Sequence, residues 1–406
     1  MTSSALPIAG AGRVQAAGMV QAAGMVQAAG MGQAAGMGQP LFIGSEIYRG
    51  SSYGMFHPLR VPRVSTVMDL ARTMGWLPQA NYRTSPRAKP AALTLWHSPA
   101  YVAALQAAEV AGVVDDATCK RHHLGTLSNP VFPQMYRRPA TGAGGVMLAA
   151  ELLRDGGVVH VPGGGTHHGM PDRANGFCYL NDPVLAMLAL RHLGLRRIAY
   201  VDIDAHHADG VEHAFAGDAE ALLISVHEEG RWPFTGLLTD DGGGNCFNLP
   251  VPRGFNDTEM RAVLEQLILP RVQAFRPDAV ILQCGADALE EDPLSRLCLS
   301  NNAHWAVAAA LRPLAPRYMV LGGGGYNPWS VGRCWAGVWA VLTGADVPDR
   351  LPLEAEAVLR ALHWGGGGRM APAESLLTTL RDAPREGAVG GDLRDRLAVL
   401  ARRSGP

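Results

Sequence analysis

Short runs of β-branched and aliphatic residues alternate with longer helical patterns from Leu41 onward, and this alternation constrains the fold more than any other feature of the chain. Strands that are separated by helices pair in parallel, and the helices then cover the faces of the sheet. Helices are predicted over residues 183–193 and 258–275. Core strands are predicted over residues 157–161, 197–203, 222–226, 279–283 and 318–321. We therefore expect an α/β protein with a mainly parallel sheet.

The two ends of the chain differ from this central part. Residues 1–40 contain a hexapeptide repeat of Gly, Ala, Gln, Val and Met, with too few large apolar side chains to offset the entropy of ordering. We predict that this segment is disordered, and its repeated methionines leave open a translation start within it. Residues 41–348 are expected to form one domain. Residues 349–406 are expected to be a peripheral tail with helices near 353–362 and 393–401.

Composition argues against several classes of protein. The 35 basic and 36 acidic side chains nearly cancel, so no polyanion-binding surface and no nucleic-acid partner are expected. The six cysteines form no Cys-x-x-Cys pair, which fits a reducing compartment, and we expect a cytoplasmic protein. No apolar run approaches the roughly 20 residues that span a bilayer, so we expect a soluble protein with no membrane segment.

Polar clusters follow four of the five predicted strands, at the point where each strand ends. They are residues 163–168 (GGGTHH), 202–210 (DIDAHHADG), 285–287 (GAD) and 322–326 (GGGGY). Ligands of open parallel sheets bind beyond the carboxyl ends of the strands. The four clusters are therefore expected to surround one site.

Three of these residues are candidate metal ligands. Asp204 and His206 are two residues apart where a strand gives way to a loop, so their side chains can share one ion, and Asp287 could complete the set. Two carboxylates and one imidazole leave a fourth position open for water, as in catalytic zinc sites. A ferrous ion would suit the same ligands. Asp287 alone could instead cap the helix that follows it.

The same clusters offer acid, base and hydrogen-bond donor groups. The vicinal pair His167 and His168 is the best candidate for the base that a metal-bound water needs. Asp202 and Asp209 could fix the tautomers of these rings by binding their far nitrogens. Tyr326 follows four glycines and could donate to a developing oxyanion. Each residue alone also has a structural explanation, but burying so many unpaired polar groups would be costly, which favours one common site.

Taken together, these segments resemble the histone deacetylase superfamily, in particular the bacterial acetoin-utilization-type or histone-deacetylase-like amidohydrolases. The resemblance extends over roughly residues 41 to 345. Its motifs are residues 57–63, 129–132, 163–168, 175–182, 202–210, 285–287, 292–294 and 322–326.

The resemblance implies a single three-layer α/β/α domain of the arginase-deacetylase type, with residues 41–348 as the catalytic domain around an eight-stranded sheet. It implies one zinc ion per chain, held by Asp204, His206 and Asp287. His167 and His168 would then be the general acid/base pair. Tyr326 would polarise the carbonyl of an N-acyl amide, which is hydrolysed to a carboxylate and a free amine.

The resemblance also implies a narrow acyl-lysine-like tunnel. Phe177 and an aromatic residue from the loop 232–234, such as Trp232, would form its walls. Gly176 would offer its carbonyl to the substrate amide, and Leu294 would lie near the rim. Relatives place an arginine along an internal product channel, and Arg63 matches that position. A monovalent cation, usually potassium, is implied beside the zinc site at Asp202, Asp204 and Ser225.

Two departures from the family pattern concern the mouth of the tunnel. Many relatives carry an acidic rim residue that grips the backbone of a peptide, whereas this chain has Leu127 and Ser128. The family's Pro-Gly-Thr-Gly loop is here residues 233–236, PFTG. We therefore expect a small acylated amine or acyl-lysine as substrate. Acidic residues at 228, 229, 240 and 241 could favour a cationic amine such as a polyamine.

Three alternatives stay open from the sequence. The chain could be a protein lysine deacetylase of the histone type, or an inactive homologue that only binds. It could also be an arginase-like ureohydrolase, which needs a two-manganese cluster, although the sequence offers only one Asp-x-His in the right place. The oligomeric state is not predicted.

Overall fold

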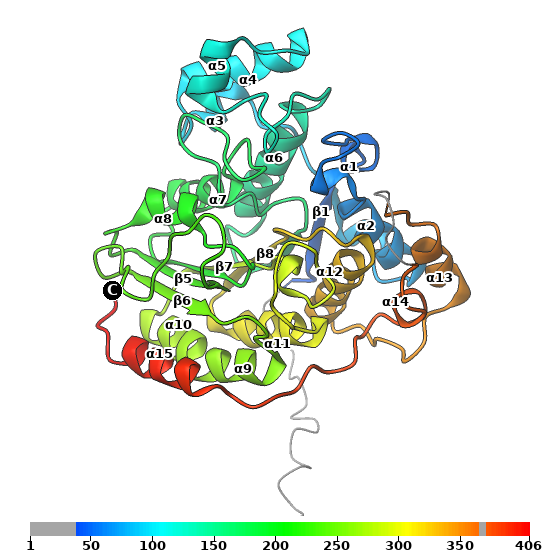
Figure 1. The fold of residues 1–406 in the computed structure, drawn as a ribbon, viewed down its shortest axis with the longest axis vertical. Helices are drawn as coiled ribbons and strands as arrows, with labels where there is room; N and C mark the ends of the chain where they lie inside the picture. The colour runs from blue at the N-terminus through cyan, green and yellow to red at the C-terminus, as the bar shows by residue number, and fades with distance from the viewer. Residues whose placement is uncertain (1–37, 365–370) are drawn as a thin grey trace, which may run out of the picture. The chain divides into compact units, whose positions relative to one another are not determined.

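The computed structural model describes residues 38–364 and 371–406. Its centre is an eight-stranded parallel sheet with the strand order β2-β1-β3-β8-β7-β4-β5-β6 (Figure 1). The strands are β1 (Leu41–Gly44), β2 (Tyr82–Thr84), β3 (Gly157–Val161), β4 (Ile198–Asp202), β5 (Ala221–Glu228), β6 (Cys246–Val251), β7 (Ala279–Gln283) and β8 (Arg317–Leu321). This confirms the expected α/β class and the eight parallel strands.

All five strands predicted from the apolar runs are present, with ends that shift by at most a few residues. The sequence patterns did not reveal β1, β2 and β6. β1 and β2 have only four and three residues. β6 reads CFNLPV, in which Asn248 and Pro250 interrupt the apolar run. Pro250 is accommodated because β6 is an edge strand of the sheet.

Helices cover both faces of the sheet (Figure 1). One layer contains α6, α7 and α8, and the other contains α2, α9 to α12 and the segment η3. The described helices are α1 (Ile47–Gly50), α2 (Val64–Thr73), α3 (Pro90–Leu93), α4 (Pro99–Ala111), α5 (Asp116–His122), α6 (Arg137–Leu152), α7 (Asp182–His192), α8 (Asp209–Phe215), α9 (Asp257–Val263), α10 (Leu269–Phe275), α11 (Asn301–Leu311), α12 (Pro328–Thr343), α13 (Leu353–Arg360), α14 (Ser375–Thr378) and α15 (Gly391–Ala401). Short 3₁₀ turns are η1 (Pro58–Arg60), η2 (Gln79–Asn81), η4 (Ala286–Ala288) and η5 (Arg312–Leu314), and η3 (Leu264–Ile268) is a π-helical segment that joins α9 to α10.

The central strands are buried on both faces, which explains their continuous apolar runs. On one face, Val146 and Met187 belong to the same buried cluster as Tyr200 and Met319. On the other face, the ring of Trp339 stacks on that of His160 at 6.3 Å. The sheet is thus a rigid support for the loops at its carboxyl edge.

The described part of the chain after residue 348 lies against the sheet domain. Arg333 of α12 forms an ion pair with Asp382 at 2.6 Å, and both side chains are buried. The terminal helix α15 contacts β6 and η3. Helices occur at Leu353–Arg360 and Gly391–Ala401, close to the two predicted in this region. The domain limits 41–348 and 349–406 stay predictions.

The repeat predicted to be disordered falls almost entirely outside the described residues. Within residues 38–364 and 371–406, no helix is long and apolar enough to cross a membrane.

Candidate active site

The loop after β4 owes its shape to aspartates that each accept a backbone hydrogen bond from two residues ahead. Asp202 Oδ1 accepts from the amide of Asp204 at 2.9 Å, and Asp204 Oδ1 accepts from the amide of His206 at 3.0 Å. Asp287, which follows the neighbouring strand β7, accepts from the amide of Ala205 at 3.0 Å. These bonds bring residues from two strand ends into one cluster.

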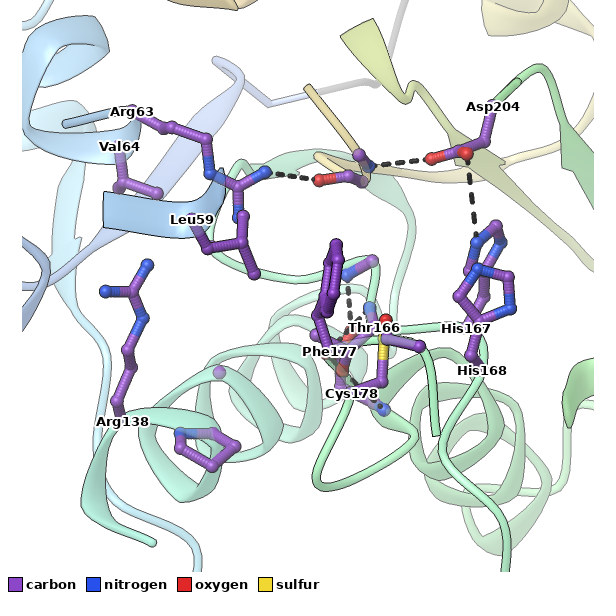
Figure 2. Close-up of a pocket in the computed structure, with 18 of the residues that line it drawn as sticks. Leu59, Arg63, Val64, Arg138, Thr166, His167, His168, Phe177, Cys178 and Asp204 are labelled. Carbon is purple, nitrogen blue, oxygen red and sulfur yellow. Dashed lines mark hydrogen bonds and ion pairs between the residues drawn. The ribbon is translucent and has the colours of Figure 1, made fainter. Parts of the chain in front are cut away.

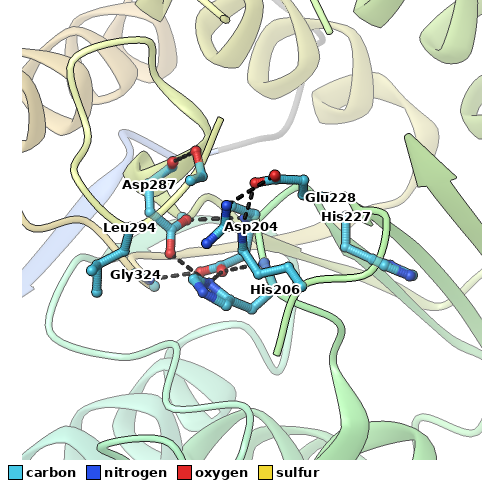
Figure 3. Close-up of polar contacts among 12 residues, drawn as sticks. Asp204, His206, His227, Glu228, Asp287, Leu294 and Gly324 are labelled. Atoms are coloured by element: carbon cyan, nitrogen blue, oxygen red, sulfur yellow. Dashed lines mark hydrogen bonds and ion pairs between the residues drawn. The ribbon is translucent and has the colours of Figure 1, made fainter. Parts of the chain in front are cut away.

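Asp204, His206 and Asp287 form this ligand cluster, and each offers an atom within 4.8 Å of the other two (Figure 3). The Nδ1 of His206 is 2.9 Å from Asp287 Oδ2 and 3.2 Å from Asp204 Oδ1. All three side chains are buried. Two carboxylates buried this close together are costly without a cation. The donors therefore fit one divalent ion, and two oxygens with one nitrogen suit Zn²⁺ and Fe²⁺ alike.

Glycines make room for the ligand cluster. A Cβ at Gly324 would lie 2.0 Å from Asp287 Oδ2, and one at Gly285 would lie 2.1 Å from Asp204 Oδ2. Burial opposes protonation of His206, but Asp287 and Asp204 outweigh it and raise the pKa of His206 to about 10. The negative potential that raises this pKa also attracts a metal cation.

Two His–Asp pairs lie next to the ligand cluster. His167 Nδ1 is 2.7 Å from Asp202 Oδ2, and His168 Nδ1 is 2.6 Å from Asp209 Oδ1. The centroids of the two imidazole rings are 4.0 Å apart. Because the carboxylates bind the Nδ1 atoms, Nε2 is the nitrogen that each ring has left for chemistry.

The pKa values of the two rings shift in opposite directions. Burial lowers the pKa of both histidines, but Asp202 and Asp204 reverse this for His167 and raise its pKa to about 9. His168 lies beside His167 and has a pKa of about 4, because burial and the neighbouring positive charge outweigh Asp209. In the absence of a metal ion, the surrounding charges thus raise the pKa of one imidazole and lower that of its neighbour.

Tyr326 lines the same cavity as the two histidines. Its backbone amide donates to Asp292 Oδ2 at 2.6 Å, which fixes the residue after the glycines. Its ring contacts that of Phe177 edge to face at 5.9 Å. Burial raises the pKa of Tyr326 well above its usual value, so the hydroxyl keeps its proton and can donate it in a hydrogen bond.

An entrance pocket of about 750 Å³ leads to these groups. His168, His206 and Tyr326 line it, together with all four residues predicted to bind substrate. The ring of Trp232 is 4.7 Å from that of His168. The predicted substrate-binding residues in its walls are Gly176, Phe177, Trp232 and Leu294.

A second, inner cavity of about 50 Å³ continues beyond the histidines. Figure 2 shows His167, His168 and Asp204 on one side of it and Arg63 and Arg138 on the other. Arg63 Nη1 donates to the carbonyl of Gly323 at 2.6 Å. Arg63 lines this cavity, and its place along a product channel stays a prediction.

The residues predicted for potassium are less clearly assembled. Asp202 lies opposite Ser225 in the β4–β5 ladder. Ser225 Oγ is 2.9 Å from His227 Nδ1, while both Asp202 oxygens accept bonds from Asp204, His167 and Tyr200. The site at Asp202, Asp204 and Ser225 stays a prediction.

Several residues that shape the site were not singled out from the sequence. Asn181 Nδ2 donates to the carbonyls of His167 and Gly169, both at 3.0 Å. Asp182 accepts from the amide of Gly165 at 2.6 Å. Asn181 and Asp182 lie within the motif 175–182, which was a signal for them. His97, whose Nε2 accepts from the amide of Asn181 at 3.0 Å, had no such signal.

Comparisons with known proteins agree with this geometry. The sequence profile named histone deacetylase domain matches residues 57–342. The acetoin utilization protein AcuC of Bacillus subtilis is 32% identical over 312 residues, which cover 73% of this chain and 80% of that protein. Putative histone deacetylase 2 of Caenorhabditis elegans is 33% identical over 310 residues, which cover 74% of this chain and 61% of that protein.

Solved structures are similar over nearly the whole fold. The crystal structure of an HDAC homolog from Aquifex aeolicus has a TM-score of 0.85 at 33% identity, and the match covers 90% of this chain and 100% of that one. The structure of an HDAC homolog complexed with SAHA gives the same values. The chain therefore belongs to the histone deacetylase family, whose members hydrolyse acetyl-amide bonds.

Proposed function

We propose that this protein is a metal-dependent deacylase that removes an acyl group, acetyl above all, from the nitrogen of a compact amine. One observation carries the proposal: the ligand cluster, the two His–Asp pairs and Tyr326 meet at a single cavity. Amide hydrolysis needs a group that polarises the carbonyl, a base for water and an acid for the leaving amine. This cavity offers candidates for all three.

In this proposal Asp204, His206 and Asp287 hold one Zn²⁺ ion, with Fe²⁺ as the other ion that suits these donors. When bound, such an ion supplies a Lewis acid for the carbonyl and makes a water molecule more acidic.

The protein's own groups would handle the protons. Asp202 and Asp209 hold the protons of His167 and His168 on Nδ1, so Nε2 of each ring is free to exchange a proton with water or with the leaving amine. Tyr326 would donate a hydrogen bond to the carbonyl oxygen as negative charge develops there. Phe177 and Trp232 would exclude water from the acyl chain, and the carbonyl of Gly176 would accept from the substrate amide.

We also propose a potassium ion near Asp202, Asp204 and Ser225. The burial of Asp202 against Ser225, close to the loop that carries the metal ligands, supports it. Dialysis from potassium into a tetramethylammonium buffer should lower the melting temperature, and unchanged stability would contradict this part of the proposal.

We propose a compact substrate rather than a long peptide. Ser128 stands where a rim carboxylate would grip a peptide backbone, and its carbonyl is bound by His57 Nε2 at 3.2 Å. The predicted acidic attraction for a polyamine stays a prediction: Glu228 and Glu229 line the entrance pocket, and each is paired with an arginine. Glu228 forms an ion pair with Arg231, and Asp240 and Asp241 accept bonds from the backbone of their own loop.

The rival ureohydrolase reaction requires a two-metal cluster. Among residues 38–364 and 371–406, Asp204, His206 and Asp287 are the only group placed to hold a metal ion. The single-metal amide hydrolysis is therefore the better supported reaction.

The decisive experiment measures metal content and turnover together. The purified protein is stripped with a chelator, reloaded with Zn²⁺ or Fe²⁺, and assayed with N-acetylcadaverine, Nε-acetyl-lysine and an acetyl-lysine peptide. We expect turnover to vanish on stripping and to return at one ion per chain. Turnover that survives complete removal of metal would overturn the proposal.

A further inference from the structure

The loop between β5 and β6 forms one side of the entrance, and its residues 229–238 are here called the rim loop. The ring of Trp232 on this loop lies against His168. It also lies so close to Gly176 that a Cβ there would be 2.2 Å from it. Any movement of the rim loop therefore changes both the width of the entrance and the packing around His168.

Two buried histidines hold the inner part of the rim loop. His207 Nδ1 is 2.8 Å from Thr235 Oγ1, and His227 Nε2 donates to the carbonyl of Gly236 at 2.9 Å. A Cβ at Gly236 would lie 2.4 Å from the ring of His207, so the backbone sits directly on this ring. These contacts fix residues 235 and 236, several positions away from Trp232.

The two ends of the rim loop are held by arginines from the far end of the chain. Arg396 of α15 forms ion pairs with Glu229 at 3.0 Å and with Asp392 of its own helix at 2.7 Å, and it donates to the carbonyl of Pro250 at 2.7 Å. Arg403, just after α15, donates to the carbonyl of Leu238. The side chain of Arg396 is only 13% exposed, although Glu229 is 54% exposed. The first and the last residue of the rim loop thus each bind a C-terminal arginine.

The helix that carries Arg396 is itself firmly placed. Leu393, Leu397 and Leu400 of α15 are buried, and Arg271 Nη2 donates to the carbonyl of Leu400 at 2.6 Å. Figure 1 shows α15 beside α9 and α10, with the chain end near β5 and β6. A cavity of about 410 Å³ separates α15 from part of the rim loop. Beside this cavity, Arg396 and Arg403 provide polar contacts between the C-terminal residues and the rim loop.

We propose that α15 holds the rim loop at the active-site entrance. Arg396 is then a positioning residue that acts on Trp232 through Glu229. The inference rests on the proposed deacylase function. A rim loop released from Arg396 no longer presses Trp232 against Gly176, so a compact substrate is held less well. The groups that handle protons and the carbonyl lie outside the rim loop. His168 loses a packing neighbour but keeps its bond to Asp209, so we expect the chemical step to be largely kept.

A purely structural role for Arg396 makes different predictions. If Arg396 only anchors α15, then R396A lowers the melting temperature while E229A has no effect on catalysis. If Arg396 acts through Glu229, both variants change the same kinetic constant, and E229A leaves the melting temperature nearly unchanged because Glu229 is half exposed. R394A is the matched control, because Arg394 lies on α15 but bonds only the local carbonyl of Val389.

The test compares full-length wild type, R396A, R396K, E229A, R394A and the double variant R396A/E229A with N-acetylcadaverine and an acetyl-lysine peptide. For R396A we expect KM for the small amide to rise about fivefold with kcat nearly kept, in the range of one partly exposed ion pair. R396K should recover part of this loss and R394A should match wild type. The double variant should be no worse than R396A, since Glu229 acts on the loop through Arg396.

Hydrogen exchange gives a readout that needs no turnover. R396A and E229A should speed amide exchange in residues 229–234 and leave residues 203–210 protected. Additive effects in the double variant, or unchanged exchange in the rim loop, would overturn the inference while the deacylase proposal stands. A wild type that hydrolyses no acyl amide would refute the proposed function instead, and the exchange data would still decide whether Arg396 holds the loop.

Discussion

Replacing Tyr326 with Phe tests the proposed chemistry directly, because the change removes one oxygen atom and little else. The ring would keep its contact with Phe177, and the backbone would keep its bond to Asp292. No described side chain depends on the Tyr326 hydroxyl for a hydrogen bond. The fold and the ligand cluster should therefore survive the substitution.

The expected loss follows from the role of the hydroxyl. Removing one oxyanion donor from a buried site costs about 2.7–4 kcal/mol of transition-state stabilisation, or about 10²–10³-fold in kcat. Tyr326 lines the same cavity as His167 and His168 and is itself buried, so the full range applies rather than a solvent-screened fraction of it. Since the bond strengthens mainly as charge develops, KM should change little.

The assay is steady-state hydrolysis of N-acetylcadaverine, with metal content and melting temperature measured on the same samples. Tyr101→Phe is a matched control, because it removes a buried hydroxyl that bonds the carbonyl of Tyr179 in the core around α4. The control should lose about 1 kcal/mol of stability and keep its kcat. A Tyr326→Phe variant with kcat within threefold of wild type would mean that another group polarises the carbonyl.

Asp287→Ala should lose metal and activity together, since one of three protein ligands is gone; full occupancy by elemental analysis would contradict the ligand set. Ser128→Asp should improve kcat/KM selectively for acetyl-lysine peptides, by about 1.5–3 kcal/mol for each charge-assisted bond gained. A wild type that already prefers long peptides by about tenfold, or ~1.4 kcal/mol, would refute the compact-substrate proposal. Burial lowers the pKa of His97 to about 4, below its value of about 6.5 in the unfolded chain. Between these two values the unfolded chain binds a proton that the folded chain does not. The free energy of unfolding should therefore fall by up to about 3 kcal/mol as the pH drops from about 6.5 toward 4. His97→Gln should flatten this part of the curve of melting temperature against pH, and parallel curves would argue against it. Deleting residues 2–39 should leave melting temperature and kcat/KM unchanged, because their composition predicts no core burial, and loss of either would show a role for the segment.

The central strands were predictable because both of their faces are buried. The runs that became β3, β4, β5, β7 and β8 are mainly apolar, as expected for strands in the middle of a covered sheet. The edge of the sheet was not predictable in the same way. β1 and β2 are too short to show a pattern. β6 contains the polar residue Asn248, whose side-chain amide donates to Glu212, a contact that only the folded structure reveals.

The candidate site could be located from the sequence because its reactive side chains follow strand ends, where the topology brings them together. Groups that act through backbone atoms were much harder to find. Asn181 holds two carbonyls of the histidine loop and His97 holds the amide of Asn181, yet neither contributes a reactive atom. The link between Arg396 and Glu229 joins residues far apart in the sequence, so local patterns could not suggest it.

The glycines beside the ligand cluster offer a way to sort related chains by their ability to hold metal. A side chain at position 324 or 285 would occupy the space of a carboxylate oxygen that the ion needs. A chain that retains Asp204, His206 and Asp287 but carries alanine at either position should therefore fail to load its ion, even though an inspection of the ligands alone would classify it as active. Screening such sequences for glycine at positions 285 and 324, in addition to the three ligands, would separate metalloenzymes from pseudoenzymes before any protein is made.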